Sequence, residues 1–295
     1  MPLPKSVSPE LYPFESHYLD IGGHQYHYLD EGKGEPVLML HGNPSWSFYY
    51  RELVKRLSPN YHCLVPDHIG MGLSDKPGDD AYSYTLPQRV RDLEAFLEAR
   101  GIHENITLVL HDWGGAIGMS YARRHPDAIK KIVLLNTSAF HLPETKPFPL
   151  MLQLTRTWLG AFAVRGFNVF NGGSTLIGTR RKPMSAEIRR AYTAPYDTWE
   201  NRIGTLRFVQ DIPLRKGDPG YDYVEDLQDH LHLFRETPVM IAWGLKDVVF
   251  DKHFLNKWLE YLPHAQVHRF EDCGHYVLED AQEEIGALVE DFLAK

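Results

Sequence analysis

Short apolar segments alternate with longer amphipathic ones along most of this chain, and this alternation limits the folds open to it. The segment 86–100, for example, has apolar residues at a period near 3.6 and is followed by Gly101, a common helix terminator. Short apolar strands between such helices predict βαβ units, with helices on both faces of a mostly parallel sheet. Residues 17–21 and 25–30 flank Gly22-Gly23, a hairpin signal that adds an antiparallel edge. Eight strands are predicted in all, at 17–21, 25–30, 36–40, 62–66, 107–111, 131–135, 239–243 and 266–270.

The alternation stops between residues 137 and 214. This stretch is rich in aromatic residues and proline, and its segments 151–162 and 186–193 have the pattern of helices. We therefore predict a helical lid at 137–214, inserted into an α/β core that is formed by residues 1–136 and 215–295.

The composition is that of a soluble globular protein, since 43% of the 295 residues are hydrophobic and the formal net charge is −8 at pH 7. Lys and Arg are scattered apart from Arg180-Arg181-Lys182, which is typical of a solvated surface turn, so nucleic-acid binding is disfavoured. No apolar run approaches the ~18–20 residues of a membrane span, and the N-terminus lacks the pattern of a signal peptide. We therefore expect a cytoplasmic protein.

No cofactor motif is found in the sequence. The two cysteines, Cys63 and Cys273, give neither a disulfide framework nor a metal-binding spacing. The segment Gly70-Met71-Gly72 lacks the third glycine of a dinucleotide-binding fingerprint. Histidines and carboxylates show no spacing typical of a catalytic metal. We predict a protein without cofactor or metal.

A carboxylate occupies the sharpest predicted turn of the chain. Asp112 follows the apolar run 107–111 and precedes Trp113-Gly114-Gly115, which opens a helix of small residues. This strand–turn–helix setting is one that presents a nucleophile at the edge of a parallel sheet. A carboxylate there can attack an sp3 carbon that bears a leaving group and form an ester with the enzyme itself. The alternative is an Asp that merely caps the next helix, but the Gly-Gly pair favours the nucleophile.

Two later strand ends carry the residues that such a nucleophile needs. His275 follows the last strand behind a glycine, where its imidazole can deprotonate water. Asp247 follows the preceding strand and is expected to accept from the imidazole Nδ1–H and to stabilise the imidazolium. A competing position for the acid lies after the strand 131–135, but that residue is Asn136, a neutral amide. Asp247 is therefore the better candidate.

Donors for a developing negative charge are predicted at Asn43, in His41-Gly42-Asn43-Pro44, and at Trp113. We assign the backbone N–H groups of these two residues to an oxyanion hole. Their side chains add an amide NH2 and an indole N–H, which suit a leaving group that departs as an anion. A turn Asn before Pro and a core Trp are the alternative interpretation, but their joint occurrence favours the functional one.

From about residue 14 to its end, the chain resembles the haloalkane dehalogenases of the α/β-hydrolase superfamily. The resemblance implies an α/β-hydrolase fold in which Asp112 is the nucleophile, His275 the base, Asp247 the acid, and Asn43 with Trp113 the halide-stabilising pair. It rests on four motifs, namely HGNP at 41–44, DHIGMGLSD at 67–75, HDWGG at 111–115 and GHYVLED at 274–280.

One departure from the dehalogenases is informative. Those that pair Asn with Trp commonly have a catalytic Glu where this chain has Asn136, so an Asn–Trp pair with a late Asp resembles the third dehalogenase subfamily. That group overlaps the β-lactone decarboxylases of bacterial long-chain olefin biosynthesis, which segments 194–214 and 243–255 resemble. The resemblance implies an apolar small-molecule substrate, a cis-β-lactone with two alkyl chains, that is converted to an alkene and CO2. It also implies assembly with other olefin-biosynthesis enzymes.

Other functions stay open at the level of the sequence. A haloalkane dehalogenase would use Asp112 to displace halide and His275 to activate the water that cleaves the ester. An epoxide hydrolase would need lid tyrosines as proton donors, for which Tyr192 and Tyr196 are candidates. A luciferase-like oxygenase without cofactor shares the same core. A non-catalytic binding protein of this fold is disfavoured by the intact Asp–His–Asp set.

Overall fold

The computed structural model describes residues 3–146 and 150–295, so residues 1–2, and residues 147–149 inside the predicted lid, lie outside the described residues. Eight strands form one sheet in the order β1-β2-β4-β3-β5-β6-β7-β8. The pairs β1–β2 and β2–β4 are antiparallel, and the other pairs are parallel. The predicted mostly parallel eight-stranded sheet is therefore confirmed. Its strands are β1 (His17–Ile21), β2 (His24–Glu31), β3 (Pro36–Leu40), β4 (His62–Pro66), β5 (Ile106–Asp112), β6 (Ile129–Thr137), β7 (Val239–Gly244) and β8 (Gln266–Phe270).

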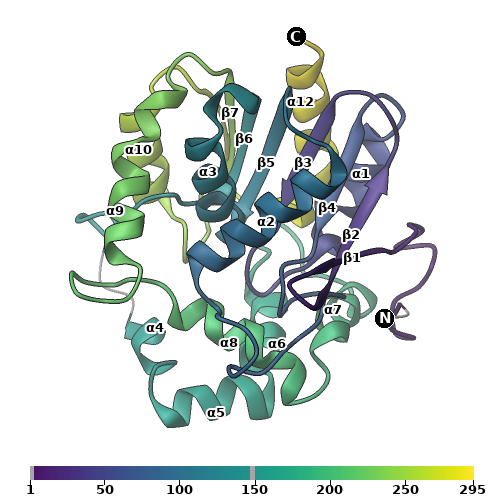
Figure 1. Ribbon diagram of the computed structural model, residues 1–295, viewed down its shortest axis with the longest axis vertical. Coiled ribbons are helices and arrows are strands. Elements are labelled where there is room, and N and C mark those ends of the chain that lie inside the picture. Colours follow the sequence, from purple (N-terminus) through teal and green to yellow (C-terminus); the bar gives the residue numbers. More distant parts are fainter. Residues whose placement is uncertain (1–2, 147–149) are drawn as a thin grey trace.

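Helices cover both faces of this sheet (Figure 1). Helices α2 and α3 pack against each other on one face, and α1 and α12 pack against each other on the other. All seven residues of β5 are buried because the sheet is covered on both sides. The helices outside the lid are α1 (Arg51–Leu57), α2 (Leu86–Arg100), α3 (Trp113–Arg124), α9 (Tyr221–Asp229), α10 (Lys252–Tyr261), α11 (Val277–Asp280) and α12 (Gln282–Ala294).

Helix α2 shows how local sequence sets these boundaries. Its first turn contains Pro87, whose missing N–H has no helical partner at that position in any case. Its apolar positions Val90, Leu93 and Leu97 are buried against the core. The helix ends at Gly101, which adopts the left-handed conformation at φ 67° that closes a helix. The predicted period and terminator are both confirmed.

Five α-helices lie between residues 150 and 210, after β6 and before α9. The predicted helix at 186–193 is confirmed as α7, whereas the prediction of one helix over 151–162 is wrong. The chain breaks after Leu154 because the hydroxyl of Thr157 accepts from the backbone N–H of Gly160 at 3.1 Å and starts a new helix there. These helices are α4 (Leu150–Leu154), α5 (Trp158–Phe167), α6 (Val169–Ile177), α7 (Ala186–Thr193) and α8 (Ile203–Gln210). No helix within 3–146 or 150–295 combines the length and apolar character needed to cross a bilayer.

Candidate active site

Asp112 lies on a strained turn where β5 passes into α3. Its backbone has φ 51° and ψ −124°, a conformation that L residues rarely adopt and that is found mainly at functional sites. The turn is tight enough that a Cβ on Gly114 would lie 1.9 Å from the carbonyl oxygen of Leu40. The Asp112 side chain makes no hydrogen bond that caps α3. Because the backbone of Asp112 is strained and its side chain does not cap α3, the interpretation of Asp112 as a nucleophile is favoured over its interpretation as a helix cap.

Backbone donors surround the Asp112 carboxyl group. The N–H of Asn43 donates to Oδ1 at 2.6 Å, and the backbone N–H of Trp113 is a second donor to this carboxyl group. Burial raises the pKa of Asp112, while the nearby His275 and these two backbone donors oppose the rise. The net pKa stays above the usual range of Asp. The carboxyl group is therefore poorly solvated, which makes its anion more reactive towards an apolar substrate.

His275 and Asp247 form a buried pair beside this carboxyl group. The Nδ1–H of His275 donates to Oδ2 of Asp247 at 2.8 Å, and Nε2 of His275 lies 3.8 Å from Oδ2 of Asp112. Burial alone would lower the pKa of His275, but the charges of Asp247 and Asp112 outweigh it, and the pKa is raised. The imidazole therefore has one nitrogen fixed by Asp247 and the other directed towards the nucleophile.

Asn136 supports the acid and does not replace it. Its amide Nδ2 donates to Oδ2 of Asp247 and to the carbonyl oxygen of Gly244, each at 3.0 Å. Its Oδ1 accepts from the backbone N–H of Gly244 at 2.8 Å, which ties the end of β6 to the end of β7. Asp247 also accepts from the N–H of Val249 at 2.7 Å. Of the two candidate acid positions, only Asp247 meets the imidazole.

The Asn43 and Trp113 side chains face the lid. The amide Nδ2 of Asn43 donates to the backbone carbonyl of Thr205 in α8 at 3.0 Å, so the resting site does not present it as a free donor. The Trp113 ring lies 5.3 Å from that of Phe208 in the same helix. The guanidinium of Arg89 is centred 5.3 Å from the Trp113 ring and contributes positive charge behind it. The predicted backbone donors are in place, whereas a leaving group would have to displace a lid carbonyl from Asn43.

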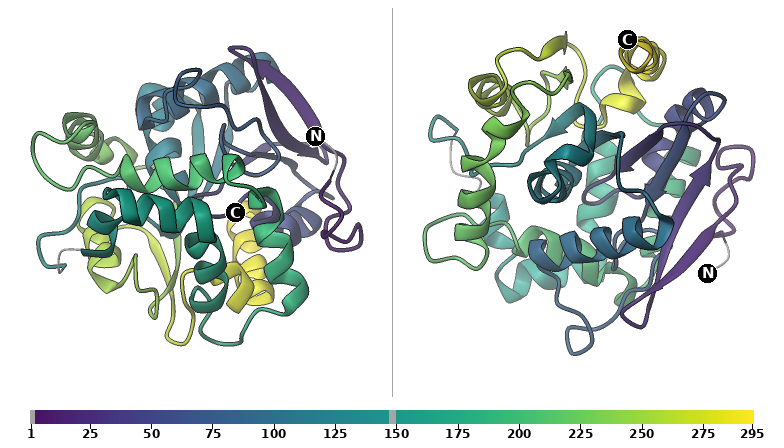
Figure 2. Two further views of the ribbon diagram at one scale, coloured as in Figure 1. Left: turned by 90° about the horizontal axis from the view of Figure 1, so that it is seen from below. Right: turned by 45° about the horizontal axis from the view of Figure 1, so that its top comes forward.

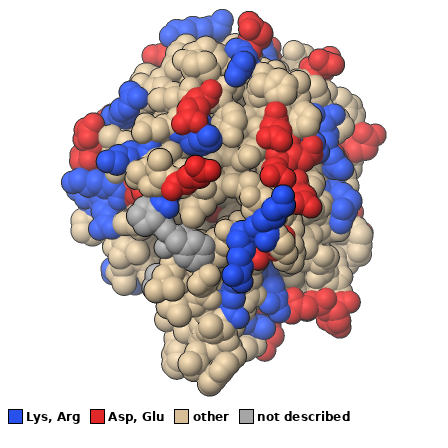
Figure 3. All heavy atoms as spheres, turned by 90° about the vertical axis from the view of Figure 1, so that its left-hand side faces the viewer, with Lys and Arg blue, Asp and Glu red and all other residues tan. Residues whose placement is uncertain are grey.

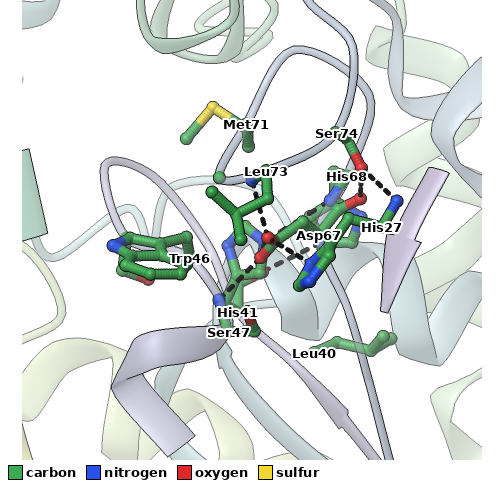
Figure 4. A network of polar contacts seen from close by, with 12 residues as sticks. His27, Leu40, His41, Trp46, Ser47, Asp67, His68, Met71, Leu73 and Ser74 are labelled. Carbon is green, nitrogen blue, oxygen red and sulfur yellow. Dashed lines mark hydrogen bonds and ion pairs between the residues drawn. The ribbon is translucent and has the colours of Figure 1, made fainter. Parts of the chain in front are cut away.

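A second polar network holds the loop that carries Asn43, although no role was predicted for its residues. Asp67, at the end of β4, accepts from Nδ1–H of His27 at 2.8 Å and from the backbone N–H of Ser47 at 2.6 Å (Figure 4). It also accepts from the N–H of Leu73 at 2.8 Å, and Nε2 of His41 lies 3.5 Å away. Burial opposes ionisation, but these partners lower the pKa of Asp67 to about 2. The carboxylate thus fixes the HGNP loop against the loop 67–75.

Asp280 performs a similar task on the other side of the site. Its carboxyl group accepts from the backbone N–H of Gly274 at 2.7 Å, next to His275. It also accepts from the N–H groups of Arg180, at 2.9 Å, and Arg181, at 3.0 Å, just after α6. The base and the segment that follows α6 are thereby held by one carboxylate. The motif GHYVLED contained this residue, but the sequence alone gave no sign of which backbone it binds.

Tyr192 and Tyr196 are bound by groups other than the Asp112 carboxyl group. The hydroxyl of Tyr192 donates to Glu279 at 2.6 Å, and that of Tyr196 donates to the carbonyl oxygen of Ser45 at 2.9 Å. Burial raises the pKa of both tyrosines well above the usual range, which makes the hydroxyls poor acids. This arrangement disfavours the epoxide-hydrolase alternative, which needs both as proton donors.

Comparisons with known proteins agree with this geometry. Residues 35–282 match the family model of the alpha/beta hydrolase fold. The chain is 57% identical to a cis-3-alkyl-4-alkyloxetan-2-one decarboxylase of Shewanella oneidensis over 97% of this chain and 90% of that protein. It is 49% identical to a protein of the same name from Xanthomonas campestris, over 96% and 97% of the two chains. Among solved structures, a haloalkane dehalogenase from Agrobacterium tumefaciens superposes with a TM-score of 0.84 at 25% identity, over 95% and 96% of the two chains. The resemblance found in the sequence is confirmed, and the chain belongs to the α/β-hydrolase fold family, in the group of the cis-3-alkyl-4-alkyloxetan-2-one decarboxylases.

Proposed function

We propose that this protein is a cofactor-free decarboxylase of cis-β-lactones that carry two alkyl chains, and that it releases a long-chain alkene and CO2. The observation that carries the proposal is the buried Asp112 carboxyl group on its strained turn, with Nε2 of His275 3.8 Å from one oxygen and the Asn43 N–H 2.6 Å from the other. The relatives in S. oneidensis and X. campestris are named as decarboxylases of such alkyl-substituted oxetan-2-ones.

The proposed reaction begins with attack by an Asp112 oxygen on ring carbon C4. A bond forms between that oxygen and C4 while the bond from C4 to the ring oxygen breaks, which leaves a free carboxylate on C3. The C3–carboxylate bond then breaks, and its electron pair forms the C3=C4 double bond. The bond from C4 to Asp112 breaks in the same step and returns its electrons to the aspartate. CO2 and alkene leave, and no water, proton or oxidant is consumed.

The surrounding groups stabilise the charges that form in these two steps. The N–H groups of Asn43 and Trp113 bind the Asp112 carboxylate before attack and again when it departs. The pKa of His275 is raised chiefly by Asp247 against the opposing effect of burial, so its imidazolium form persists to higher pH than in a free imidazole. We assign that cation to the stabilisation of the carboxylates, a role that requires no proton transfer.

We also propose that residues 137–214 act as the lid that covers this site. Three of their groups bind the loop after β3: the Thr205 carbonyl accepts from Asn43 at 3.0 Å, the Ala191 carbonyl accepts from the indole N–H of Trp46 at 3.2 Å, and Tyr196 donates to Ser45. Exclusion of water by such a cover favours the reaction of a desolvated carboxylate. A cytoplasmic location and assembly with other olefin-biosynthesis enzymes are proposed on composition and family resemblance alone.

A single-turnover experiment in H218O tests the proposal. A synthetic cis-3,4-dialkyl β-lactone is mixed with excess protein, alkene is measured by gas chromatography, and the peptide containing Asp112 is weighed. We expect one alkene per lactone and no 18O in Asp112, because ring opening and elimination use no water. Alkene formation by the variant Asp112→Asn at the wild-type rate would refute the proposal.

A haloalkane dehalogenase is the second candidate, favoured by the structural similarity to the A. tumefaciens enzyme. In that reaction neutral His275 activates water, which attacks the ester carbonyl and leaves one solvent oxygen in Asp112. The same peptide measurement with a short bromoalkane therefore separates the two functions. Bromide release much faster than alkene formation, together with 18O in Asp112, would establish the dehalogenase and reject the decarboxylase.

A further inference from the structure

Helix α6 presents its apolar side to solvent. The residues that it buries are the polar Asn171 and Thr175, whereas Val169, Leu176 and Ile177 are exposed. A surface helix of a globular protein normally does the reverse and places its apolar stripe on the core. The reversal means that α6 has no partner within the described chain for its apolar side.

Helix α5 continues this surface. Trp158 is 76% exposed and Phe167 is 72% exposed, and Leu159 and Phe162 on the same helix are exposed as well. The rings of Phe162 and Phe167 are 5.7 Å apart, so these side chains touch each other at the surface. We call the set Trp158, Leu159, Phe162, Phe167, Leu176 and Ile177 the apolar lid face.

The exposure is concentrated in this part of the molecule. Of the thirteen large hydrophobic residues that are exposed within 3–146 and 150–295, ten belong to residues 150–199. Helices α5 and α6 lie together at the end of the molecule away from the top edge of the sheet, as the view from below shows (Figure 2). Helix α5 lies at the lower end of the molecule in Figure 1. On the side drawn in Figure 3, this lower end shows no charged side chains. A patch of this kind marks a binding surface.

The segment that carries this face is basic in an acidic chain. Residues 145–186 contain no Asp or Glu, although the whole chain has 39 of them. Three of the basic side chains are paired with acidic ones, Arg156 with Asp218, Lys146 with Asp251, and Arg181 with Asp272 and Glu284, whereas Arg180 and Lys182, just after α6, are exposed. The basic residues of the segment are Lys146, Arg156, Arg165, Arg180, Arg181 and Lys182.

We propose that the apolar lid face docks on the surface of an anionic lipid bilayer. Exposed Trp, Phe and Leu side chains enter the boundary between headgroups and acyl chains, while Arg and Lys beside them pair with lipid phosphates. Residues 145–186 themselves contribute no acidic side chain that anionic headgroups would repel. In a symmetric dimer formed through this face, the basic segment of one copy would lie near that of the other. The repulsion between their positive charges disfavours such a dimer.

Docking of this kind would serve the proposed function without depending on it. A lactone with two long alkyl chains partitions into a bilayer, since each buried CH2 contributes about 0.8 kcal/mol. A lid that lies on the bilayer would meet such a substrate where it is concentrated. Only this benefit rests on the proposed function; vesicle binding is measured without substrate, so the two hypotheses can fail separately.

Vesicle flotation of the purified full-length protein tests the proposal. One set of vesicles contains equal parts of phosphatidylglycerol and phosphatidylcholine, and the other phosphatidylcholine alone. We expect at least about tenfold tighter binding to the anionic set at low salt, and weaker binding at 0.5 M salt because charges near a surface are screened. Brominated lipids should quench tryptophan fluorescence in the wild type and much less in Trp158→Phe.

Matched variants locate the surface. The double variant Trp158→Glu/Phe167→Glu should lose at least about tenfold in binding, and Arg180→Glu/Lys182→Glu should lose the preference for anionic lipid. Leu233→Glu is the control, since Leu233 is 43% exposed but lies outside the lid. Trp158 and Phe167 are 76% and 72% exposed, so folding should be retained in the double variant, which is checked by circular dichroism.

Two results would overturn the proposal. One is equal binding of the wild type, the lid variants and Leu233→Glu, or no binding at all. The other is light scattering that shows a dimer of the wild type which Trp158→Glu/Phe167→Glu dissociates, because the face would then be an interface between two copies. Turnover of a short-chain, water-soluble lactone should be unchanged in Trp158→Glu/Phe167→Glu, since both side chains are exposed and lie outside the candidate site.

Discussion

The turn that carries Asp112 and helix α6 differ sharply in how closely their backbones pack. A Cβ added to Gly115, just after Asp112, would lie 1.9 Å from Oγ1 of Thr137, whereas a Cβ on Gly172 or Gly173 of α6 would meet no atom of another described element within 4 Å. The Asp112 carboxylate is thus held by a densely packed region, whereas α6 has free space around its glycines and an exposed apolar side. This contrast agrees with the proposals that the sheet end positions the reacting groups and that α6 belongs to a cover with an outward-facing apolar side.

The largest effect is expected at the centre of the packed region. Asp112→Asn keeps the volume of the side chain but removes the nucleophile, so alkene formation should fall by about 10⁴-fold or more. Burial raises the pKa of Asp112, which shows that the folded protein disfavours its charge, and the variant should therefore unfold no more easily than the wild type. Gas chromatography of the alkene and thermal unfolding measure the two quantities. Activity within tenfold of wild type would show that the sheet end does not hold the reacting group.

The next effect concerns the buried acid. In Asp247→Asn the imidazole of His275 loses its anionic partner at 2.8 Å, and turnover should fall by about 10²–10⁴-fold. The pKa of His275 should fall as well, because the charge of Asp247 is the main influence that raises it against burial. Since the imidazolium is the proposed active form, the loss of activity on the alkaline side should move to lower pH.

The pH profile of kcat/KM checks this second prediction. In the wild type, activity should also fall on the acid side as Asp112, whose pKa burial raises, becomes protonated. Asp251→Asn is a suitable control, since Asp251 caps α10 and lies outside the site. An alkaline limb at the same pH in Asp247→Asn and wild type would contradict the electrostatic role of His275.

A third effect tests the close packing itself. Gly114→Ala would put a methyl group 1.9 Å from the carbonyl oxygen of Leu40, so the backbone must shift at the turn that carries Asp112. We expect the free energy of unfolding to fall by about 3 kcal/mol, because an extra methyl group in a densely packed interior destabilises a protein by about this amount. Urea denaturation gives this value, and alkene assays should show a loss of turnover that exceeds the loss of folded protein. A neutral effect on both would break the contrast between the two regions.

A fourth, smaller effect lies in the network at the edge of the site. The pKa of Asp67 is about 2 in the folded protein, below its value in an unfolded chain, so its stabilisation is present above pH 4 and is lost as the pH falls towards 2. The loss should be on the order of 2 kcal/mol. Stability measured from pH 5 to pH 2 should show this decline in the wild type and a weaker one in Asp67→Asn. Identical slopes would mean that the partners of the Asp67 carboxylate do not stabilise the fold.

The sequence predicted the packed region well and the lid poorly, for a physical reason. Strands such as β5 are apolar throughout because they are buried on both faces, so their composition alone predicts them. The residues Asp112, Asp247 and His275 were predicted because each follows a strand, and parallel strands bring their ends together. The structure places His275 between the two aspartates, 2.8 Å from Asp247 and 3.8 Å from Asp112, although the catalytic roles of all three stay predictions.

What the sequence could not predict depends on contacts between distant segments. The break between α4 and α5 depends on one hydroxyl, that of Thr157, which a helical pattern does not reveal. The partners of Asp67 and Asp280 are backbone N–H groups, which every residue has and which no side-chain motif can identify. The amide of Asn43 looked like a free donor until the fold placed the carbonyl of Thr205 against it.

The smallest expected effect sharpens the contrast between the Asp112 turn and α6. It is again a Gly→Ala substitution, but here the protein should become more stable, whereas Gly114→Ala should make it less stable. In α6, Gly172 and Gly173 have helical backbone and open space around a new Cβ, so Gly172→Ala should raise the free energy of unfolding by about 0.5–1 kcal/mol. The gain comes from the unfolded chain, which loses conformational freedom, and should be similar for Gly173→Ala. Urea denaturation beside Gly114→Ala measures the difference under one set of conditions. If Gly172→Ala destabilised the protein as Gly114→Ala does, α6 would have to be packed in solution as tightly as the nucleophile turn, and its exposed apolar side would need another explanation.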